Sequence, residues 1–85
     1  MVFVGTRKYK YGRMFLSHMC ANTLGELHAM AELIGLKKEW FQNEPGKKPH
    51  YDVCQLKKAE AIKHGAQLVN DRTLILMYKK RELQF

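Results

Sequence analysis

The chain has 85 residues, of which 46% are hydrophobic and 27% are charged, proportions that are ordinary for a globular protein. No apolar run approaches the ~18 residues that a membrane-spanning helix needs, and two cysteines are too few for a disulfide scaffold. Fifteen Lys and Arg against eight Asp and Glu give a formal net charge of +7, which predicts attraction to polyanions such as nucleotides or nucleic acid.

The first twenty residues predict two strands joined by a basic loop. Val2, Phe3 and Val4 form a short apolar run that ends at Gly5, as in a buried strand. Residues 6–13 are basic and aromatic and predict a loop, and residues 14–20 predict the second strand. Period-two alternation would place four side chains of that strand on one face: Met14, Leu16, His18 and Cys20.

The clearest local signal is a capping box at Thr23 and Glu26, whose side chains can satisfy the free amides at a helix start. The helix that it begins is predicted to end at Gly35, which suits a left-handed cap. Its buried stripe follows helical spacing: Leu24, Leu27, Ala31 and Ile34.

The second half of the chain alternates loops with shorter elements. Residues 37–42 predict one short turn or an edge strand, and residues 43–49 predict an exposed loop because of their Pro and Gly content. Asp52 is predicted to cap a second helix that ends at Gly65. That helix would bury Leu56, Ala59 and Ile62. A short strand over residues 66–69 and a last helix from Asn70 to Arg81 would follow.

This order of elements predicts an α/β fold. We expect a single domain over residues 1–85, with a short sheet of about three strands packed by about three helices. A chain of this length buries only about two-thirds of its surface, so its stability should be marginal, and a homodimer would relieve that. No segment resembles a signal peptide, which predicts a cytoplasmic protein. The two cysteines, Cys20 and Cys54, are expected to be small buried hydrophobes.

Several short motifs, taken in order, resemble a family of small bacterial and phage proteins of unknown function. They are Tyr11-Gly12-Arg13-Met14, Ser17-His18-Met19, Ala21-Asn22, Glu26-Leu27-His28-Ala29-Met30-Ala31, Ile34-Gly35, His50-Tyr51-Asp52 and Gly65-Ala66. The resemblance implies an intracellular protein of a bacterial host cell, often phage-encoded, with no established activity or catalytic residues. Relatives commonly have an acidic residue where this chain reads Val4-Gly5-Thr6, and an aspartate in place of Asn22.

Three histidines and one aspartate could form a metal or acid/base site: His18, His28, His50 and Asp52. Their spacing is not diagnostic of zinc, which needs three or four converging ligands. Each residue also has a structural interpretation: His18 as a hydrogen-bonded core residue, His28 paired with Glu32, and Asp52 as a helix cap. We therefore predict no cofactor and treat a divalent metal as the less favoured interpretation.

The basic loop favours a phosphate-bearing ligand, a nucleotide or nucleic acid. Arg7, Lys8 and Lys10 can meet phosphates, and an arginine can bond two phosphate oxygens at once, a role that we assign to Arg13. His18 and His50 would donate hydrogen bonds, and Tyr11 or Tyr51 would stack on a base. The predicted ligand-binding residues are Tyr11, Arg13, His18, His28, His50, Tyr51 and Asp52. The Lys pairs at 37–38, 47–48, 57–58 and 79–80 are interpreted as solubilising surface.

Two alternatives belong to other classes of function. A small hydrolase, possibly metal-dependent, would use His50 or His28 as general base with Asp52 orienting it. A protein-interaction module acting as a dimer would expose the aromatic pair Trp40-Phe41 and residues 83–85. The competing interpretation of Trp40 is that it closes the core.

Overall fold

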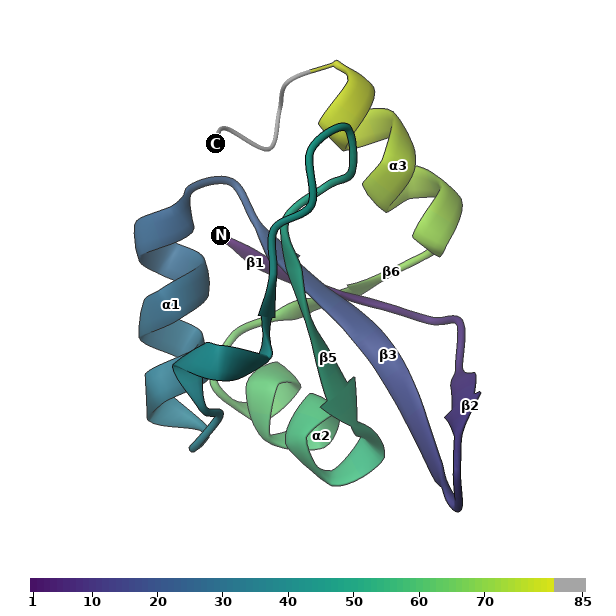
Figure 1. Ribbon diagram of the computed structural model, residues 1–85. Coiled ribbons are helices and arrows are strands. Elements are labelled where there is room, and N and C mark those ends of the chain that lie inside the picture. The colour runs from purple at the N-terminus through teal and green to yellow at the C-terminus, as the bar shows by residue number, and fades with distance from the viewer. Residues whose placement is uncertain (81–85) are drawn as a thin grey trace.

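The computed structural model describes residues 1–80 and has a mixed sheet with three helices (Figure 1). The strands are β1 (Val2–Gly5), β2 (Tyr9–Tyr11), β3 (Met14–Ala21), β4 (Phe41–Gln42), β5 (His50–Cys54) and β6 (Gln67–Val69). The helices are α1 (Leu24–Leu33), α2 (Gln55–Lys63) and α3 (Asp71–Lys79), and a 3₁₀ turn, η1, spans Lys38–Trp40. The α/β class is confirmed.

The strands lie in the order β4-β5-β3-β1-β6, and β2 pairs with the outer end of β3. Pairing is antiparallel except between β1 and β6, which run parallel. In the centre of the sheet His18 of β3 lies opposite Asp52 of β5. The first strand of the chain is therefore an interior strand, with a neighbour on either side.

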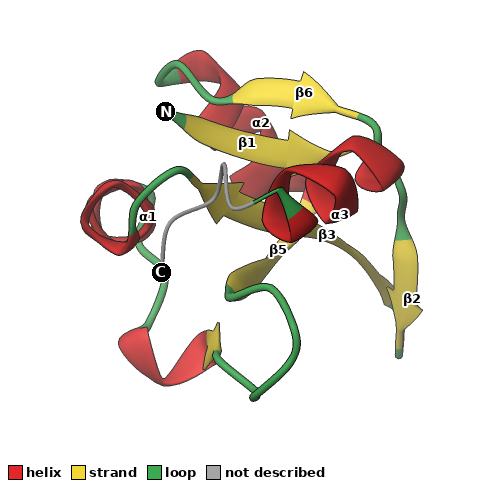
Figure 2. Cartoon of the chain, turned by 90° about the horizontal axis from the view of Figure 1, so that it is seen from above, coloured by secondary structure: helices red, strands yellow, loops and turns green. Residues whose placement is uncertain are grey.

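The two faces of the sheet carry different layers. Alternate side chains of β1, β3 and β5 point into the main core against α1 and α2, among them Val4, Met19 and Tyr51, which are fully buried. On the other face Phe3 and Cys20 pack under Leu74 of α3. In Figures 1 and 2, α3 lies over the β1 and β6 side of the sheet, apart from α1 and α2. On this side of the sheet, α3 therefore does not cover the face formed by β3 and β5.

The threonine half of the predicted capping box of α1 forms. The Glu26 amide donates to Thr23 Oγ1 at 3.2 Å, and the Thr23 hydroxyl donates to Glu26 Oε1 at 3.0 Å. Gly35 has a φ of 80°, as a left-handed cap requires. Local sequence chemistry therefore sets both ends of this helix.

The sheet is larger than the predicted three strands. β2 lies within residues that were predicted to be a loop, because Tyr9–Tyr11 pairs with β3 in a hairpin whose turn has Gly12 at a φ of 61°. The second correction is at Asp52, which does not cap a helix. It lies in the middle of β5, and Cys54 occupies the N-cap position of α2.

The predicted buried stripe of α2 is also wrong. Leu56 is 79% exposed and Ile62 is 41% exposed, and Ala59 is exposed as well. The helix starts two residues later than a cap at Asp52 implies, so a different face meets the sheet: Lys58 and Ala61 are buried. The Lys57 and Lys58 ammonium groups donate to the Ile34 carbonyl and to Ser17 Oγ, so this lysine pair is not plain solubilising surface.

Trp40 does not close the core, because 46% of its surface is exposed. Cys20 is buried as expected, whereas Cys54 is only half-buried. Within residues 1–80 no helix has the length and apolar character to cross a membrane. Arg81, the predicted end of the last helix, and residues 83–85 lie outside the described residues.

Candidate functional site

Two histidines and one aspartate meet on the sheet face beside α3. His50 and Asp52 are two residues apart on β5 and so point to the same side, and His18 faces them from β3. Asp52 Oδ1 lies 3.5 Å from His18 Nε2 and 3.4 Å from His50 Nε2. The two imidazole rings are stacked at a tilt, with centroids 4.2 Å apart. The sequence grouped these three with His28, and the structure brings together only the three.

Lys48 contacts both histidines of this cluster. Its ammonium donates to His18 Nδ1 at 2.8 Å, and its backbone carbonyl accepts a hydrogen bond from His50 Nδ1 at 2.9 Å. Because a carbonyl can only accept, the hydrogen of a neutral His50 ring lies on Nδ1. His50 Nε2 then faces the Asp52 carboxylate.

Asp71, the first residue of α3, approaches the cluster from the other side of His18. Its carboxylate accepts hydrogen bonds from the Arg7 amide at 2.9 Å and the Tyr9 hydroxyl at 3.3 Å, and Oδ2 lies 4.0 Å from His18 Nδ1. Gly5 makes this approach possible, because a β-carbon there would lie 2.3 Å from Asp71 Oδ1. The Tyr9 ring stacks on His18 at a centroid distance of 4.7 Å.

Burial and neighbouring charges set the protonation of the cluster. Burial, with the nearby His50 and Lys48, lowers the pKa of His18 to about 4. A hydrogen bond from the His50 ring is the main cause that lowers the pKa of Asp52, although burial opposes it. At neutral pH the cluster therefore presents a neutral His18 ring and an ionised Asp52 carboxylate.

A hollow of about 630 Å³ lies beside the cluster, between the residue 43–49 loop and α3. His18 and His50 form part of its wall, and Ile75 and Tyr78 of α3 form an apolar part. The remaining wall contains three lysines and one carboxylate, together with Gln42 and Gly46: Lys47, Lys48, Lys79 and Glu44. Lys47 pairs with Glu44 at 3.2 Å, whereas no other carboxylate within residues 1–80 lies within ion-pair distance of these three lysines.

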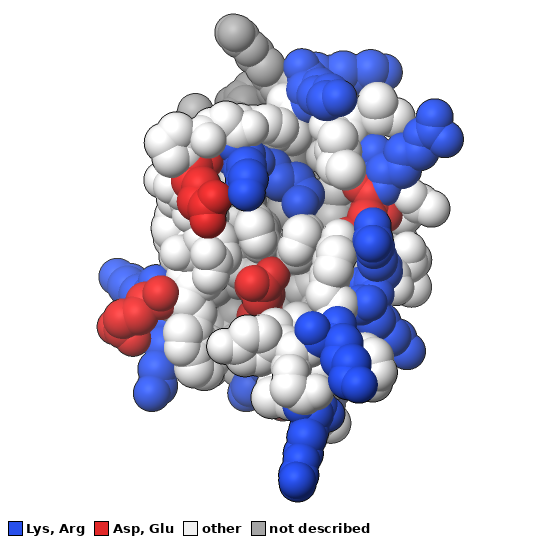
Figure 3. Space-filling model, turned by 45° about the vertical axis from the view of Figure 1, so that its right-hand side comes forward, with Lys and Arg blue, Asp and Glu red and all other residues white. Residues whose placement is uncertain are grey.

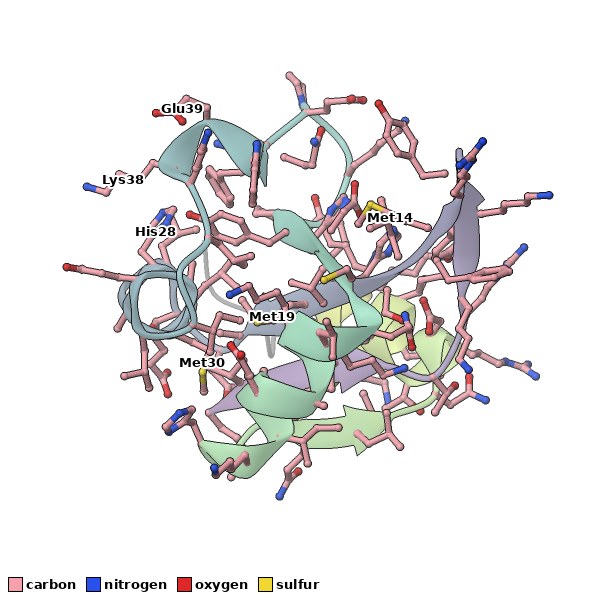
Figure 4. The ribbon with its side chains drawn as sticks, turned by 90° about the horizontal axis from the view of Figure 1, so that it is seen from below. Met14, Met19, His28, Met30, Lys38 and Glu39 are labelled. Atoms are coloured by element: carbon pink, nitrogen blue, oxygen red, sulfur yellow. The ribbon has the colours of Figure 1, made fainter. Side chains whose placement is uncertain are left out.

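His28 and Tyr51 do not belong to this cluster. Tyr51 lies between His50 and Asp52 on β5, so its side chain points to the opposite face, where it is fully buried. Its hydroxyl is hydrogen-bonded to His28 Nδ1 at 2.8 Å. Figure 4 shows His28 on α1, on the side of the η1 turn and away from Met14. A buried Tyr51 cannot stack on a ligand, and this pair serves the main core.

The predicted phosphate-binding residues lie along the edge of the sheet rather than in the hollow. Arg13 is exposed in the β2–β3 turn, and Met14, which follows it, is four residues from His18 along β3, about 13 Å in an extended strand. Arg7, Lys8 and Lys10 are exposed on the segment from β1 into β2, and Tyr11 is 73% exposed. Arg7 lies over the Tyr9 ring at 4.9 Å. Figure 3 shows Lys and Arg side chains along one side of the molecule.

Sequence reasoning missed Lys48, Tyr9 and Asp71 as members of the site. Asp71 had a usable signal, since it follows a short strand at the point where polar side chains gather in sheets with parallel strands. Tyr9 and Lys48 had none, because a lysine in a Pro/Gly loop is an ordinary surface residue and only the fold brings it to His18.

Residues 2–81 match a family model described as protein of unknown function (DUF4031). This match confirms the resemblance to a family of unknown function. No curated protein and no solved structure matches the chain.

Proposed function

We propose that this chain, which belongs to the DUF4031 family of proteins of unknown function, binds a phosphate-bearing ligand, a nucleotide or a nucleic acid end, in the hollow beside α3. The supporting observation is that Lys48 and Lys79 line this hollow without a carboxylate partner among residues 1–80. Cations gathered at a concave surface favour an anionic ligand, and phosphate oxygens accept hydrogen bonds from ammonium and imidazole groups.

The size and walls of the hollow fit this class of ligand. About 630 Å³ lies within the ~300–1,000 Å³ range of small-molecule sites. Lys47, Lys48 and Lys79 would meet the phosphates, with His18 Nε2 donating a further hydrogen bond. Ile75 and the half-buried Tyr78 offer an apolar surface for a base or sugar. If the ligand is a strand, Arg7, Lys8 and Lys10 could meet later phosphates along the sheet edge.

Titration with a nucleotide panel in the presence of EDTA tests this proposal. We expect saturable binding of nucleotides to the wild-type protein, and about tenfold weaker binding to Lys48→Gln and Lys79→Gln, since each loses a charged contact to phosphate. Lys63→Gln is the matched control, because it removes the same charge from an exposed position on α2. No binding at millimolar nucleotide, or an equal loss in Lys63→Gln, would contradict a site in this hollow.

Hydrolysis is the second candidate, and the His18, His50 and Asp52 cluster at the wall of the hollow favours it. A neutral imidazole can accept a proton from water, and the neighbouring carboxylate can stabilise the imidazolium that forms. Turnover of phosphate esters that His50→Gln abolishes while Lys63→Gln retains it would support hydrolysis. Binding without turnover, tested with and without added divalent metal, would leave the protein as a binder.

Dimerisation is the third candidate. Exposed Trp40 lines a second hollow, of about 490 Å³, together with Tyr11 and Met14, and aromatic side chains are favoured interface anchors. Sedimentation equilibrium of the wild type and Trp40→Ser tests it: a concentration-dependent dimer that the substitution weakens is expected, and a monomer at all concentrations would exclude this candidate.

A further inference from the structure

We infer that His18 Nε2, His50 Nε2 and Asp52 Oδ1 form a tetrahedral site for one divalent transition-metal ion, zinc in the first place. This inference reverses the sequence-based preference against a metal, and it stands apart from the proposed phosphate ligand because it concerns a cation on the sheet face. The three side chains offer one ligand atom each, and these atoms lie within 4.8 Å of one another. Three protein ligands are the number that a catalytic zinc site takes.

The distances between the ligand atoms fit a metal ion in a specific geometry. Ligands about 2.1 Å from a metal lie about 3.4 Å apart in a tetrahedron and about 3.0 Å apart in an octahedron. Asp52 Oδ1 is 3.4 Å from His50 Nε2 and 3.5 Å from His18 Nε2. Both distances to Asp52 Oδ1 match the edge of a tetrahedral site, and the two imidazole nitrogens lie within 4.8 Å of each other. Two imidazoles and one carboxylate also select zinc-like ions over magnesium and calcium, which prefer oxygen ligands.

A metal ion would fit between the facing atoms of His50 and Asp52. His50 donates its Nδ1 hydrogen to the Lys48 carbonyl, so the Nε2 of a neutral ring meets the Asp52 carboxylate with a lone pair. A proton on Nε2 would give a charge-assisted hydrogen bond of about 2.7–2.9 Å. The observed 3.4 Å is longer and equals the distance between two ligands of a tetrahedral zinc ion.

The surroundings of His50 resemble the outer shell of known metal sites. A metal-binding histidine usually donates its other ring N–H to a carbonyl or a carboxylate, which fixes the ring and its tautomer. His50 already makes this bond, to the Lys48 carbonyl at 2.9 Å. For His18 the carboxylate near Nδ1 is that of Asp71, whose Oδ2 lies 4.0 Å away, so a small shift of the ring would be needed for a hydrogen bond.

Lys48 competes with the metal for His18. Its ammonium donates to His18 Nδ1 at 2.8 Å, so the hydrogen of the neutral ring lies on Nε2, the atom that the metal requires. Binding of the metal moves that hydrogen to Nδ1, which then turns from an acceptor for Lys48 into a donor to Asp71. Lys48 must leave, and its positive charge also opposes a second cation nearby. Removal of the ammonium should therefore strengthen metal binding.

Equilibrium dialysis of the full chain against Zn²⁺ alone, in a buffer free of phosphate, tests the site. We expect one equivalent per chain, and at least about tenfold weaker binding to His50→Gln and to Asp52→Asn, which changes the charge but hardly the shape. Exposed His64, at the C-terminal end of α2, gives the matched control: His64→Gln should bind zinc within about twofold of the wild type. Co²⁺ should give the strong visible absorption of a tetrahedral complex.

Lys48→Met adds a result that misfolding cannot produce, because it should bind Zn²⁺ about tenfold more tightly than the wild type. Asp71→Asn should bind about tenfold more weakly, since it weakens the acceptor for His18 Nδ1. Less than one equivalent of zinc at saturation, binding that survives both His50→Gln and Asp52→Asn, or no gain in Lys48→Met would overturn the inference. Because the titration uses the metal alone and the nucleotide titration uses EDTA, each can fail without the other.

Discussion

Replacing Gly5 with alanine tests the packing that holds Asp71 beside the site. The added β-carbon would lie 2.3 Å from Asp71 Oδ1 and 2.8 Å from its Cγ, well inside van der Waals contact, so the carboxylate has to move. It would then lose the hydrogen bonds from the Arg7 amide at 2.9 Å and the Tyr9 hydroxyl at 3.3 Å. The connection from β1 to β2 is held to α3 by these two bonds.

The expected cost follows from these two bonds. Hydrogen bonds to a charged group contribute about 1.5–3 kcal/mol each, and the displaced carboxylate recovers part of this by meeting water. We therefore expect Gly5→Ala to lower the free energy of unfolding by about 2–3 kcal/mol. A domain of this size changes Tm by about 4–8 °C per kcal/mol, so the fall in Tm should be about 10–20 °C.

Thermal and urea unfolding followed by circular dichroism measure this effect. Gly25→Ala is the matched control, because a β-carbon there meets nothing within 4 Å and alanine favours a helix over glycine by about 0.5–1 kcal/mol. In an Asp71→Ala background Gly5→Ala should cost less than about 0.5 kcal/mol, since the clash has gone. An equal cost in both backgrounds, or no cost in the wild type, would refute this account of Gly5.

Three further predictions concern the surface and the core. If Arg7 and Lys8 meet phosphates, the log of the affinity for single-stranded DNA should fall linearly with the log of the salt concentration. The double variant Arg7→Gln/Lys8→Gln should reduce the magnitude of that slope by about 1.4. An unchanged slope would exclude both contacts. Burial raises the pKa of the Cys20 thiol to about 12, so iodoacetamide should label half-buried Cys54 first and Cys20 only on unfolding, as peptide mass spectrometry can show. Lys58 is only 8% exposed, so Lys58→Glu should lower the free energy of unfolding by more than about 2 kcal/mol. Lys63→Glu, at an exposed position, should change it by less than about 0.5 kcal/mol. Similar costs for the two variants in urea unfolding would show that Lys58 is not held in the core.

The parts of the fold that were predicted correctly have local causes. Thr23 and Glu26 start α1 through bonds three residues apart, and Gly35 ends it with its own backbone conformation. Such signals can be found in one sequence because both partners lie within one turn.

The parts that were predicted wrongly depend on distant partners. Asp52 has the chemistry of a helix cap, but pairing of β5 with β3 keeps it in a strand opposite His18. The alternation of polar and apolar residues from His50 to Cys54 was the available signal for that strand. The same pairing brings His18 to the side chains of His50 and Asp52. The sequence alone could not show that His28 and Tyr51 lie elsewhere, because that depends on which face of the sheet each side chain occupies.

The interior position of β1 has a consequence for folding during synthesis. β1 can pair with β3 early, but its other edge pairs with β6, and Phe3 lies opposite Gln67. Until residues 67–69 have left the ribosome, an apolar strand edge stays unpaired, which is the kind of edge that recruits other chains. His18, His50 and Asp52 all precede that point, so the nascent β3 and β5 can bring them together while the sheet is still incomplete. A cation bound at that stage would hold these two strands in register and would lower the risk of aggregation before β6 closes the sheet.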